Sequence, residues 1–442
     1  MKKIVLWFLG VATSLSLITI SLIGPVDNSP LENRESYRQT MERLDTFHPM
    51  HHSPKTKLKA GWAKVNITPR SRMPMAGYAP RNHFDTVHDS VYVRILAIDN
   101  GGIQCFMISA DLLIFPPALK QKLLQQKNGE RFLYFTATHA HSSLGAWDNS
   151  VIGNLILGSY NDQWLDSLAD KIHTAMNVAA AQLTPATINY FEANADEYVE
   201  NRIDPKQGST DGTIRGLKIL REDGSKGLLV SYSAHPTNID HLSLALSGDY
   251  PAGLISRAEQ KGYNFALFAS GNIGSHRVKW MPEKEFVMCD SLAYKLYRTV
   301  QGAADVAIKD SSINTSIIHV NYAPSQLHIL QRYKVRDWVF RILFRKLRGD
   351  IRYMKIGNII FLGMPCDFSG EIFVRDGLGK LAESEGEKLF ITSFNGDYVG
   401  YITDDRYYGH SEQEEIMAMN WVGPHYGTYF SQIIKKIIIK SK

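Results

Sequence analysis

The chain has 442 residues, of which 44% are hydrophobic and 21% are charged, and its formal net charge is +5 at neutral pH. This composition is typical of a globular protein and excludes a disordered or collagen-like chain. The net charge is small and gives no indication of nucleic-acid binding.

Residues 1–24 contain Lys2 and Lys3, followed by an apolar stretch from Ile4 to Gly24. The stretch is long enough to cross a bilayer as a helix. The two lysines favour a cytoplasmic N-terminus with the rest of the chain on the far side. Because the apolar run is long and Pro25 makes a poor cleavage site, we favour a signal anchor over a cleaved signal peptide. The body is then membrane-anchored and periplasmic or extracellular, or secreted if the segment is cleaved.

Residues 25–57 are polar and carry several prolines, which predicts a linker. From residue 58 onward, β-prone runs alternate with helical patterns. This alternation predicts an α/β or α+β fold, a layered sandwich in which helices flank a mixed β-sheet, in one large domain over residues 58–442. Strands are expected at 91–99, 104–110, 132–137, 186–191, 214–220, 227–234, 265–269, 317–322, 354–362 and 389–393, and helices at 116–126, 162–181, 251–261 and 290–304.

The segment from Tyr333 to Arg352 combines arginines at helical spacing with an apolar side. This pattern predicts a basic amphipathic helix that lies on an anionic membrane surface, or an ordinary surface helix whose apolar stripe faces the core.

The three cysteines, Cys105, Cys289 and Cys366, are too few for a disulfide framework, and their spacing suits no structural zinc site. We expect them to be small buried apolar residues.

His139 and His141 directly follow an apolar, β-prone run. In an extended chain, residues i and i+2 point to the same side, so both imidazoles can face one pocket. Neutral imidazole is a common zinc ligand, and a histidine that is not bound to metal can transfer protons. The alternative is a pair of hydrogen-bonded loop histidines without metal.

Three other places also have a polar, potentially ligating residue after an apolar run. They are His235, whose backbone is restricted by the following proline, the segment from Met364 to Glu371, which contains Asp367, and the segment from Asn395 to Thr403, which contains Tyr401. Two histidines, a carboxylate and one further donor would make a catalytic zinc site. Zinc lowers the pKa of a bound water and polarises a carbonyl group.

These fragments, in this order, resemble the catalytic domain of the neutral, non-lysosomal ceramidase family. The resemblance runs from about residue 60 to about residue 427. Its motifs are GWAKVNITP at 61–69, MAGY at 75–78, VRILA at 93–97, ISADL at 108–112, THAHSS at 138–143, AHPT at 234–237, SGDYPAG at 247–253 and NGDYVGYIT at 395–403.

The resemblance implies that a single Zn²⁺ is held by His139, His235, Asp367 and Tyr401. His141 would be the histidine that transfers a proton or contacts the substrate. The family has glutamate where this chain has Asp367. Aspartate is shorter but binds zinc at a similar bond length, and Glu371 is a candidate replacement.

A second departure lies at residues 269–276, where the family has Ser-Pro and this chain has Gly274 and Ser275. The family's catalytically important serine is then missing, or Ser275 supplies its hydroxyl one residue later.

The resemblance implies an exported, zinc-dependent amidohydrolase in sphingolipid metabolism that hydrolyses the N-acyl amide of ceramide or a related lipid at a membrane surface. One alternative keeps the metal but acts on a non-lipid amide or ester. Another is a non-catalytic surface binding protein of the same fold. The sequence gives no oligomeric state.

Overall fold

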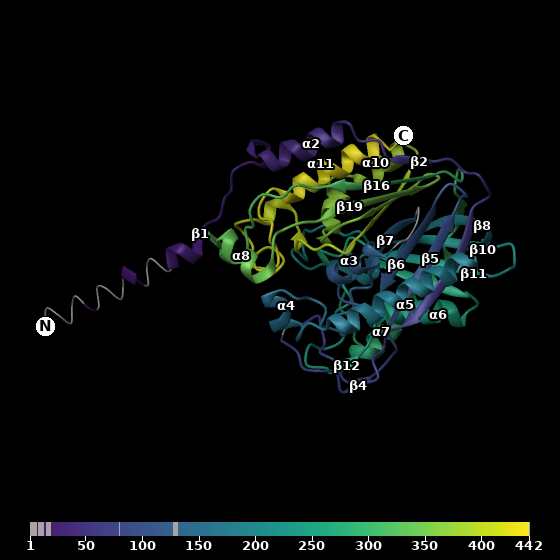
Figure 1. Ribbon diagram of the computed structural model, residues 1–442, viewed down its shortest axis with the longest axis horizontal. Helices are drawn as coiled ribbons and strands as arrows, with labels where there is room; N and C mark the ends of the chain where they lie inside the picture. The colour runs from purple at the N-terminus through teal and green to yellow at the C-terminus, as the bar shows by residue number, and fades with distance from the viewer. Residues whose placement is uncertain (1–6, 8–12, 15–18, 79, 127–130, 442) are drawn as a thin grey trace.

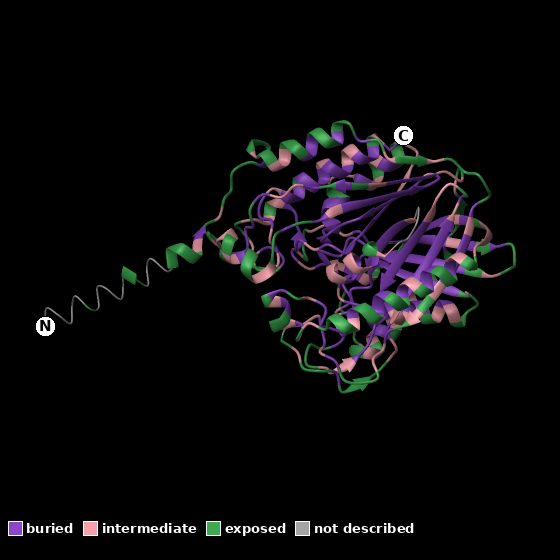
Figure 2. Ribbon diagram, viewed as in Figure 1, coloured by how far each residue is buried: buried purple, intermediate pink, exposed green. Residues whose placement is uncertain are grey.

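The computed structural model describes residues 7, 13–14, 19–78, 80–126 and 131–441 (Figure 1). Two mixed β-sheets pack face to face, and helices cover the outer face of each sheet. This arrangement confirms the predicted α/β class and the flanking helices. Figure 2 shows that the strands form the buried interior, whereas the helices are exposed on their outer sides.

The larger sheet has the order β13-β11-β10-β8-β3-β5-β6-β7, and β15 pairs with β8. Most neighbouring strands are antiparallel, but β11 pairs in parallel with β13, and β6 pairs in parallel with β7. The bounds are β3 Lys59–Asn66, β5 Tyr92–Asp99, β6 Gln104–Ala110, β7 Arg131–Ala137, β8 Thr184–Asn194, β10 Thr213–Arg221, β11 Lys226–Tyr232, β13 Phe265–Ser270 and β15 Asp305–Ala307.

The smaller sheet has the order β2-β16-β19-β20-β22, with β20 and β22 parallel. Its strands are β2 Met50–His52, β16 Ile313–His319, β19 Asp350–Ile356, β20 Ile359–Gly363 and β22 Lys388–Thr392. Short pairings join β1 Ile23–Pro25, β18 Tyr333–Val335 and β17 His328–Leu330; β4 Thr86–Val87 and β12 Ala245–Leu246; β9 Val199–Asn201 and β14 His276–Val278; and β21 Asp367–Phe368 and β23 Tyr401–Ile402.

The strand periodicity explains the layering. On β5, Ile95 and Ala97 face the helices, whereas Leu96 and Ile98 face the core between the two sheets. Successive side chains of a strand point to opposite faces, so the sequence of a strand that is buried on both faces is continuously apolar. On the smaller sheet, Phe361 points into the same inter-sheet core.

The helices are α2 Glu35–Asp45, α3 Pro117–Gln125, α4 Val151–Ile156, α5 Asp162–Ala181, α6 Asp249–Gln260, α7 Glu285–Gly302, α8 Asp337–Phe344, α9 Gly370–Arg375, α10 Leu378–Ser384 and α11 Tyr426–Ile439, with short 3₁₀ turns η1 Leu31–Asn33, η2 Asp196–Tyr198 and η3 Asp405–Tyr407. Helices α3, α5, α6 and α7 cover the larger sheet, and α2, α9, α10 and α11 cover the smaller one. The long α5 begins at Asn161, whose side chain accepts a hydrogen bond from the backbone of Trp164.

The linker expected over residues 25–57 instead contains ordered elements. Helix α2 buries Met41 and Leu44 in the core beneath α11, and β2 pairs with β16. These apolar positions are spaced three residues apart, which places them on one face of a helix. The polar composition of the segment reflects the solvent-facing side of α2.

The prediction of a single basic helix from Tyr333 to Arg352 is also wrong. The segment contains β18, the short helix α8 and the start of β19. The helix stops where Arg345 takes a φ of 79°, a left-handed conformation that ends a helical turn. Arg352 is buried in β19 and donates to the carbonyl of Leu133. The strand expected over 354–362 is likewise a hairpin of β19 and β20, which turns at Gly357 with a φ of 54°.

The apolar segment of residues 1–24 lies mostly outside the described residues. Within the described part of the chain, no helix is both long and apolar enough to cross a bilayer. The three cysteines are free and buried, as expected.

Candidate metal centre

The two histidines after β7 do not stand on an extended chain. His139 has a φ of 60°, in the left-handed region. The backbone therefore turns at this residue. The prediction assumed an extended chain that points both side chains to one side, and this assumption is wrong. The turn nevertheless brings the two side chains together, with 3.0 Å between their Nε2 atoms.

His235 reaches the same point from the end of β11, just before Pro236. Its Nε2 atom lies 2.7 Å from Nε2 of His139 and 3.2 Å from Nε2 of His141. The three histidines form a group that could hold a metal ion. Three unprotonated nitrogens at these distances repel one another unless a cation lies among them, so the donor set fits a metal.

Backbone carbonyls orient two of the rings. Nδ1 of His139 lies 2.5 Å from the carbonyl of Leu113, and Nδ1 of His235 lies 3.4 Å from the carbonyl of Ile273. If each Nδ1–H donates to its carbonyl, the lone pair of each Nε2 faces the common centre. This second contact of a histidine is typical of metal ligands because it fixes the tautomer and the ring orientation.

Asp367 and Tyr401 are brought to the histidines by β21 and β23, which pair in parallel with these two residues in register. Oδ1 of Asp367 lies 3.6 Å from Nε2 of His139 and has no hydrogen-bond partner among the described residues. Oδ2 accepts a 2.7 Å hydrogen bond from the hydroxyl of Tyr398. The Tyr401 hydroxyl lies 3.4 Å from Nε2 of His235. The structure therefore brings the expected ligand set together.

Burial controls the charges in this centre. It lowers the pKa of His141 to about 3 and the pKa of His139 and His235 well below the usual range, so all three are neutral and able to bind metal. Burial also raises the pKa of Asp367 to about 7, although the Tyr398 hydrogen bond opposes this rise. A bound cation would favour the ionised carboxylate.

Arg202 is a charged neighbour that the sequence did not reveal. It follows β9, pairs with the buried carboxylate of Glu415 at 2.5 Å, and its backbone N–H donates to the carbonyl of Ser275. Its positive charge lowers the pKa of Asp367 and of the histidines. No motif marks an isolated arginine in a sequence, so only the fold could have shown its position.

Glu371 lies apart from the three histidines. Its carboxylate accepts hydrogen bonds from Asn201 at 2.9 Å and from the hydroxyl of Tyr407 at 2.8 Å, and it pairs with Arg406. These partners occupy its oxygens. Asp367, with a free oxygen toward His139, is thus better placed than Glu371 to bind a metal.

Ser275 is fully buried, and its hydroxyl is engaged elsewhere. The hydroxyl of Ser369 lies 2.9 Å from Oγ of Ser275, and the backbone N–H of Glu371 donates to the same oxygen. At the preceding position, a Cβ on Gly274 would lie 2.5 Å from the carbonyl oxygen of Asp367. The backbone of β21 therefore fills the space that a serine side chain at residue 274 would need.

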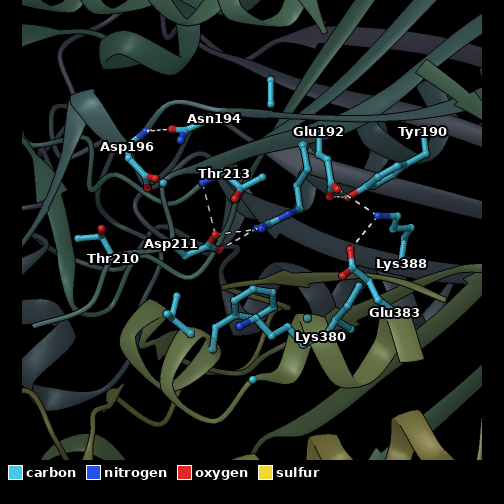
Figure 3. Close-up of a pocket in the computed structure, with 18 residues that line it drawn as sticks. Tyr190, Glu192, Asn194, Asp196, Thr210, Asp211, Thr213, Lys380, Glu383 and Lys388 are labelled. Carbon is cyan, nitrogen blue, oxygen red and sulfur yellow. Dashed lines mark hydrogen bonds and ion pairs between the residues drawn. The ribbon is translucent and has the colours of Figure 1, made fainter. Parts of the chain in front are cut away.

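A polar cavity of about 530 Å³ lies between β8, β10 and the helices α9 and α10 (Figure 3). Asp211 and Arg215 form a buried ion pair in its wall, with contacts of 2.8 and 2.9 Å. Asp211 also accepts a 2.8 Å hydrogen bond from the side chain of Asn272. Because Ile273 follows directly and contacts His235, this ion pair supports the loop behind the metal centre.

The part of the chain that carries the three histidines is similar to a known protein family. Residues 58–262 match the family described as neutral/alkaline non-lysosomal ceramidase, N-terminal. This part of the chain is therefore similar to the neutral/alkaline ceramidase family. The matched segment includes His139, His141 and His235 but ends before Asp367 and Tyr401. No curated protein sequence matches the chain.

Solved ceramidase structures share the fold over most of the chain. The crystal structure of neutral ceramidase from Pseudomonas aeruginosa superposes with a TM-score of 0.74 at 15% identity, covering 87% of this chain and 74% of that chain. A structure described as ceramidase complexed with C2 gives a TM-score of 0.71 at 14% identity, covering 87% and 75%. At such low identity these likenesses establish the fold alone.

Proposed function

We propose that the protein is an exported, zinc-dependent amidase that hydrolyses the N-acyl amide of ceramide or a related lipid. The convergence of the Nε2 atoms of His139, His141 and His235 beside the unpaired Oδ1 of Asp367 carries this proposal. The match of residues 58–262 to the ceramidase family supports the amide bond as the bond that is broken.

His139, His235, Asp367 and Tyr401 would hold the metal. A bound Zn²⁺ would polarise the amide carbonyl of the substrate and lower the pKa of a water molecule. Tyr398 keeps one oxygen of Asp367 engaged, so that the other oxygen faces His139.

His141 is the proposed proton carrier. Burial lowers its pKa to about 3, which leaves the imidazole neutral at pH 7. It would take a proton from the attacking water and return it to the nitrogen of the leaving amine, as general base and then general acid. Water adds to the carbonyl carbon, the C–N bond breaks, and the products are a carboxylic acid and an amine. His141 also belongs to the metal-binding group, so a role as a third histidine ligand is the alternative.

Arg202 would stabilise the negative charge that develops on the carbonyl oxygen. A fixed positive charge in a site shielded from water is effective in this role. The ion pair with Glu415 holds the guanidinium in position before the reaction begins.

Because Gly274 has no room for a side chain, the attacking group in this proposal is water, and no serine takes part. The same departure from the family favours a second candidate function, the hydrolysis of a non-lipid amide.

The two candidates are separated with the purified full chain in detergent. We expect release of the fluorescent fatty acid from a labelled ceramide and loss of this release on chelation, with recovery on addition of Zn²⁺. Cleavage of a short, water-soluble N-acyl amide without any turnover of the ceramide would favour the second function. A protein that binds zinc and cleaves neither substrate would contradict both.

A further inference from the structure

One end of the molecule carries apolar side chains that are exposed to solvent. Helix α8 presents Trp338 and Ile342, which are 50% and 60% exposed, and α4 presents Leu155, which is 69% exposed. Arg345 at the end of α8 donates to the carbonyl of Asn149 just before α4, so the two helices lie side by side. Figure 1 shows α4 and α8 near one another at the end of the body where β1 enters. Large apolar side chains that are exposed together on neighbouring helices are typical of an interaction site.

The N-terminal segment joins the body at this surface without a spacer. Strand β1 pairs with β18, directly before α8. Trp338 donates its indole N–H to the carbonyl of Ser21, and Arg336 donates to the carbonyls of Ile20 and Ile23. The apolar sequence ends at Gly24, inside β1. If this sequence enters a bilayer, α8 must lie at the bilayer surface.

Cationic side chains surround the apolar surface. Lys346 and Arg348 are exposed in the loop that follows α8, beside Arg345. Arg341 on α8 pairs with Asp337. Apolar and aromatic side chains next to lysine and arginine are typical of protein surfaces that bind anionic lipid bilayers.

Aromatic side chains connect this surface to the metal centre. Phe344 of α8 packs on Trp421 with ring centroids 5.0 Å apart, and Trp421 packs on Tyr398 at 5.1 Å. Tyr398 donates to Asp367. The metal centre therefore lies behind the same end of the molecule, two aromatic rings from α8.

We propose that α8, α4 and residues 19–22, directly before β1, form a docking surface for the anionic surface of a lipid bilayer, which places the metal centre close to the membrane. The occupant is the bilayer because the apolar segment of residues 4–24 leads into this surface. The inference depends on that segment but not on the proposed amidase activity.

The test uses the full chain reconstituted in vesicles of phosphatidylcholine and phosphatidylglycerol. A nitroxide spin label on Ile342→Cys is compared with one on Val306→Cys, in β15 of the larger sheet, where the native side chain is 65% exposed. The native cysteines are buried, so labelling is restricted to the introduced residues. We expect the label at residue 342 to collide severalfold less with a water-soluble nickel chelate and more with oxygen than the label at residue 306.

Leu155→Cys is the second position and should behave like Ile342→Cys. Exchange of Lys346 and Arg348 for glutamine should move the label at residue 342 toward water in the anionic vesicles but not in vesicles of phosphatidylcholine alone, because the attraction is electrostatic. Equal accessibility at residues 342, 155 and 306 would overturn the proposal. An effect on the label that appears only when another protein is added would identify a protein partner instead. No substrate is turned over in this experiment, so its failure leaves the proposed activity unaffected.

Discussion

Tyr398 donates a 2.7 Å hydrogen bond to Oδ2 of Asp367, and this bond fixes which carboxylate oxygen faces His139. The remaining oxygen, Oδ1, is buried and has no hydrogen-bond partner in the described part of the chain. A buried carboxylate oxygen without a partner is unfavourable unless a cation binds it. The hydrogen bond therefore turns the free oxygen of Asp367 toward His139, where a metal ligand is proposed, and makes Tyr398 the proposed positioning residue.

Removing this hydrogen bond should weaken metal binding. We expect Tyr398→Phe to lower zinc affinity about 10- to 100-fold, as loss of a group that orients a metal ligand typically does. Competition with a fluorescent chelator measures the affinity. Tyr408→Phe is the matched control, because the buried hydroxyl of Tyr408 has no hydrogen-bond partner in the part of the chain described. Equal affinities in the two variants would show that Tyr398 does not position the ligand.

Single substitutions of a carboxylate by an amide distinguish the roles of Asp367 and Glu371. Asp367→Asn should lose most of the bound zinc, because an amide is a much weaker zinc ligand than a carboxylate. Glu371→Gln should keep the metal and lose thermal stability, because it removes the charge of a buried carboxylate that pairs with Arg406. Zinc content and thermal unfolding of both variants are measured. Loss of zinc in Glu371→Gln with full zinc in Asp367→Asn would reverse the assignment.

The histidine assignment predicts about one zinc per chain, because the described residues contain one group of converging histidine donors. His235→Ala should remove most of it, as determined by elemental analysis. The matched control is His319→Ala, since the side chain of His319 is exposed at 66% in β16 and pairs with Asp350. Full zinc with unchanged affinity in His235→Ala would mean that the ligand assignment is wrong.

His141→Ala distinguishes a proton carrier from a ligand. If His141 transfers protons, the variant keeps its zinc and loses about 100- to 10,000-fold in kcat. In a plot of residual activity against pH, the change in rate that is due to titration of His141 should then be absent. If zinc is lost together with activity, His141 is the third histidine ligand, as its short distances to the other two rings allow.

Restoring the family's serine by Gly274→Ser should destabilise the protein without raising its activity. The added Cβ would lie 2.5 Å from the carbonyl oxygen of Asp367, so β21 would have to move. Overpacking of a buried site costs about 1–3 kcal/mol of unfolding free energy. Urea denaturation measures this loss against Gly302→Ser, where a Cβ meets no atom within 4 Å. A stable Gly274→Ser variant with higher activity would show that the serine position is still functional.

The local sequence pattern predicted much of the sheet and the residues of the site. Apolar runs that end in polar residues located His139 at the end of β7 and His235 at the end of β11, because a buried strand must stop where ligating side chains begin. The motif resemblance placed Asp367 and Tyr401 beside them, and the structure brings these residues to the same centre.

The errors also have local causes. Residues 25–57 were expected to form a linker because their composition is polar, but α2 needs only a few apolar residues at helical spacing to pack on the core. The segment from Tyr333 to Arg352 has helical periodicity, yet Arg345 turns left-handed and Arg352 joins a strand. Pairing with β16 and β20 outweighs the weak local preference for a helix.

The sequence by itself determined which residue types were available for the chemistry, since imidazole, carboxylate and phenol groups have fixed donor properties. Only the tertiary structure decided how they are used. The register of β21 with β23 places Asp367 beside Tyr401 and His139, the carbonyl of Asp367 fills the space of a side chain at residue 274, and an ion pair with Glu415 holds Arg202 near the site. These outcomes depend on contacts between segments far apart in the chain, and no local pattern encodes the distances between them.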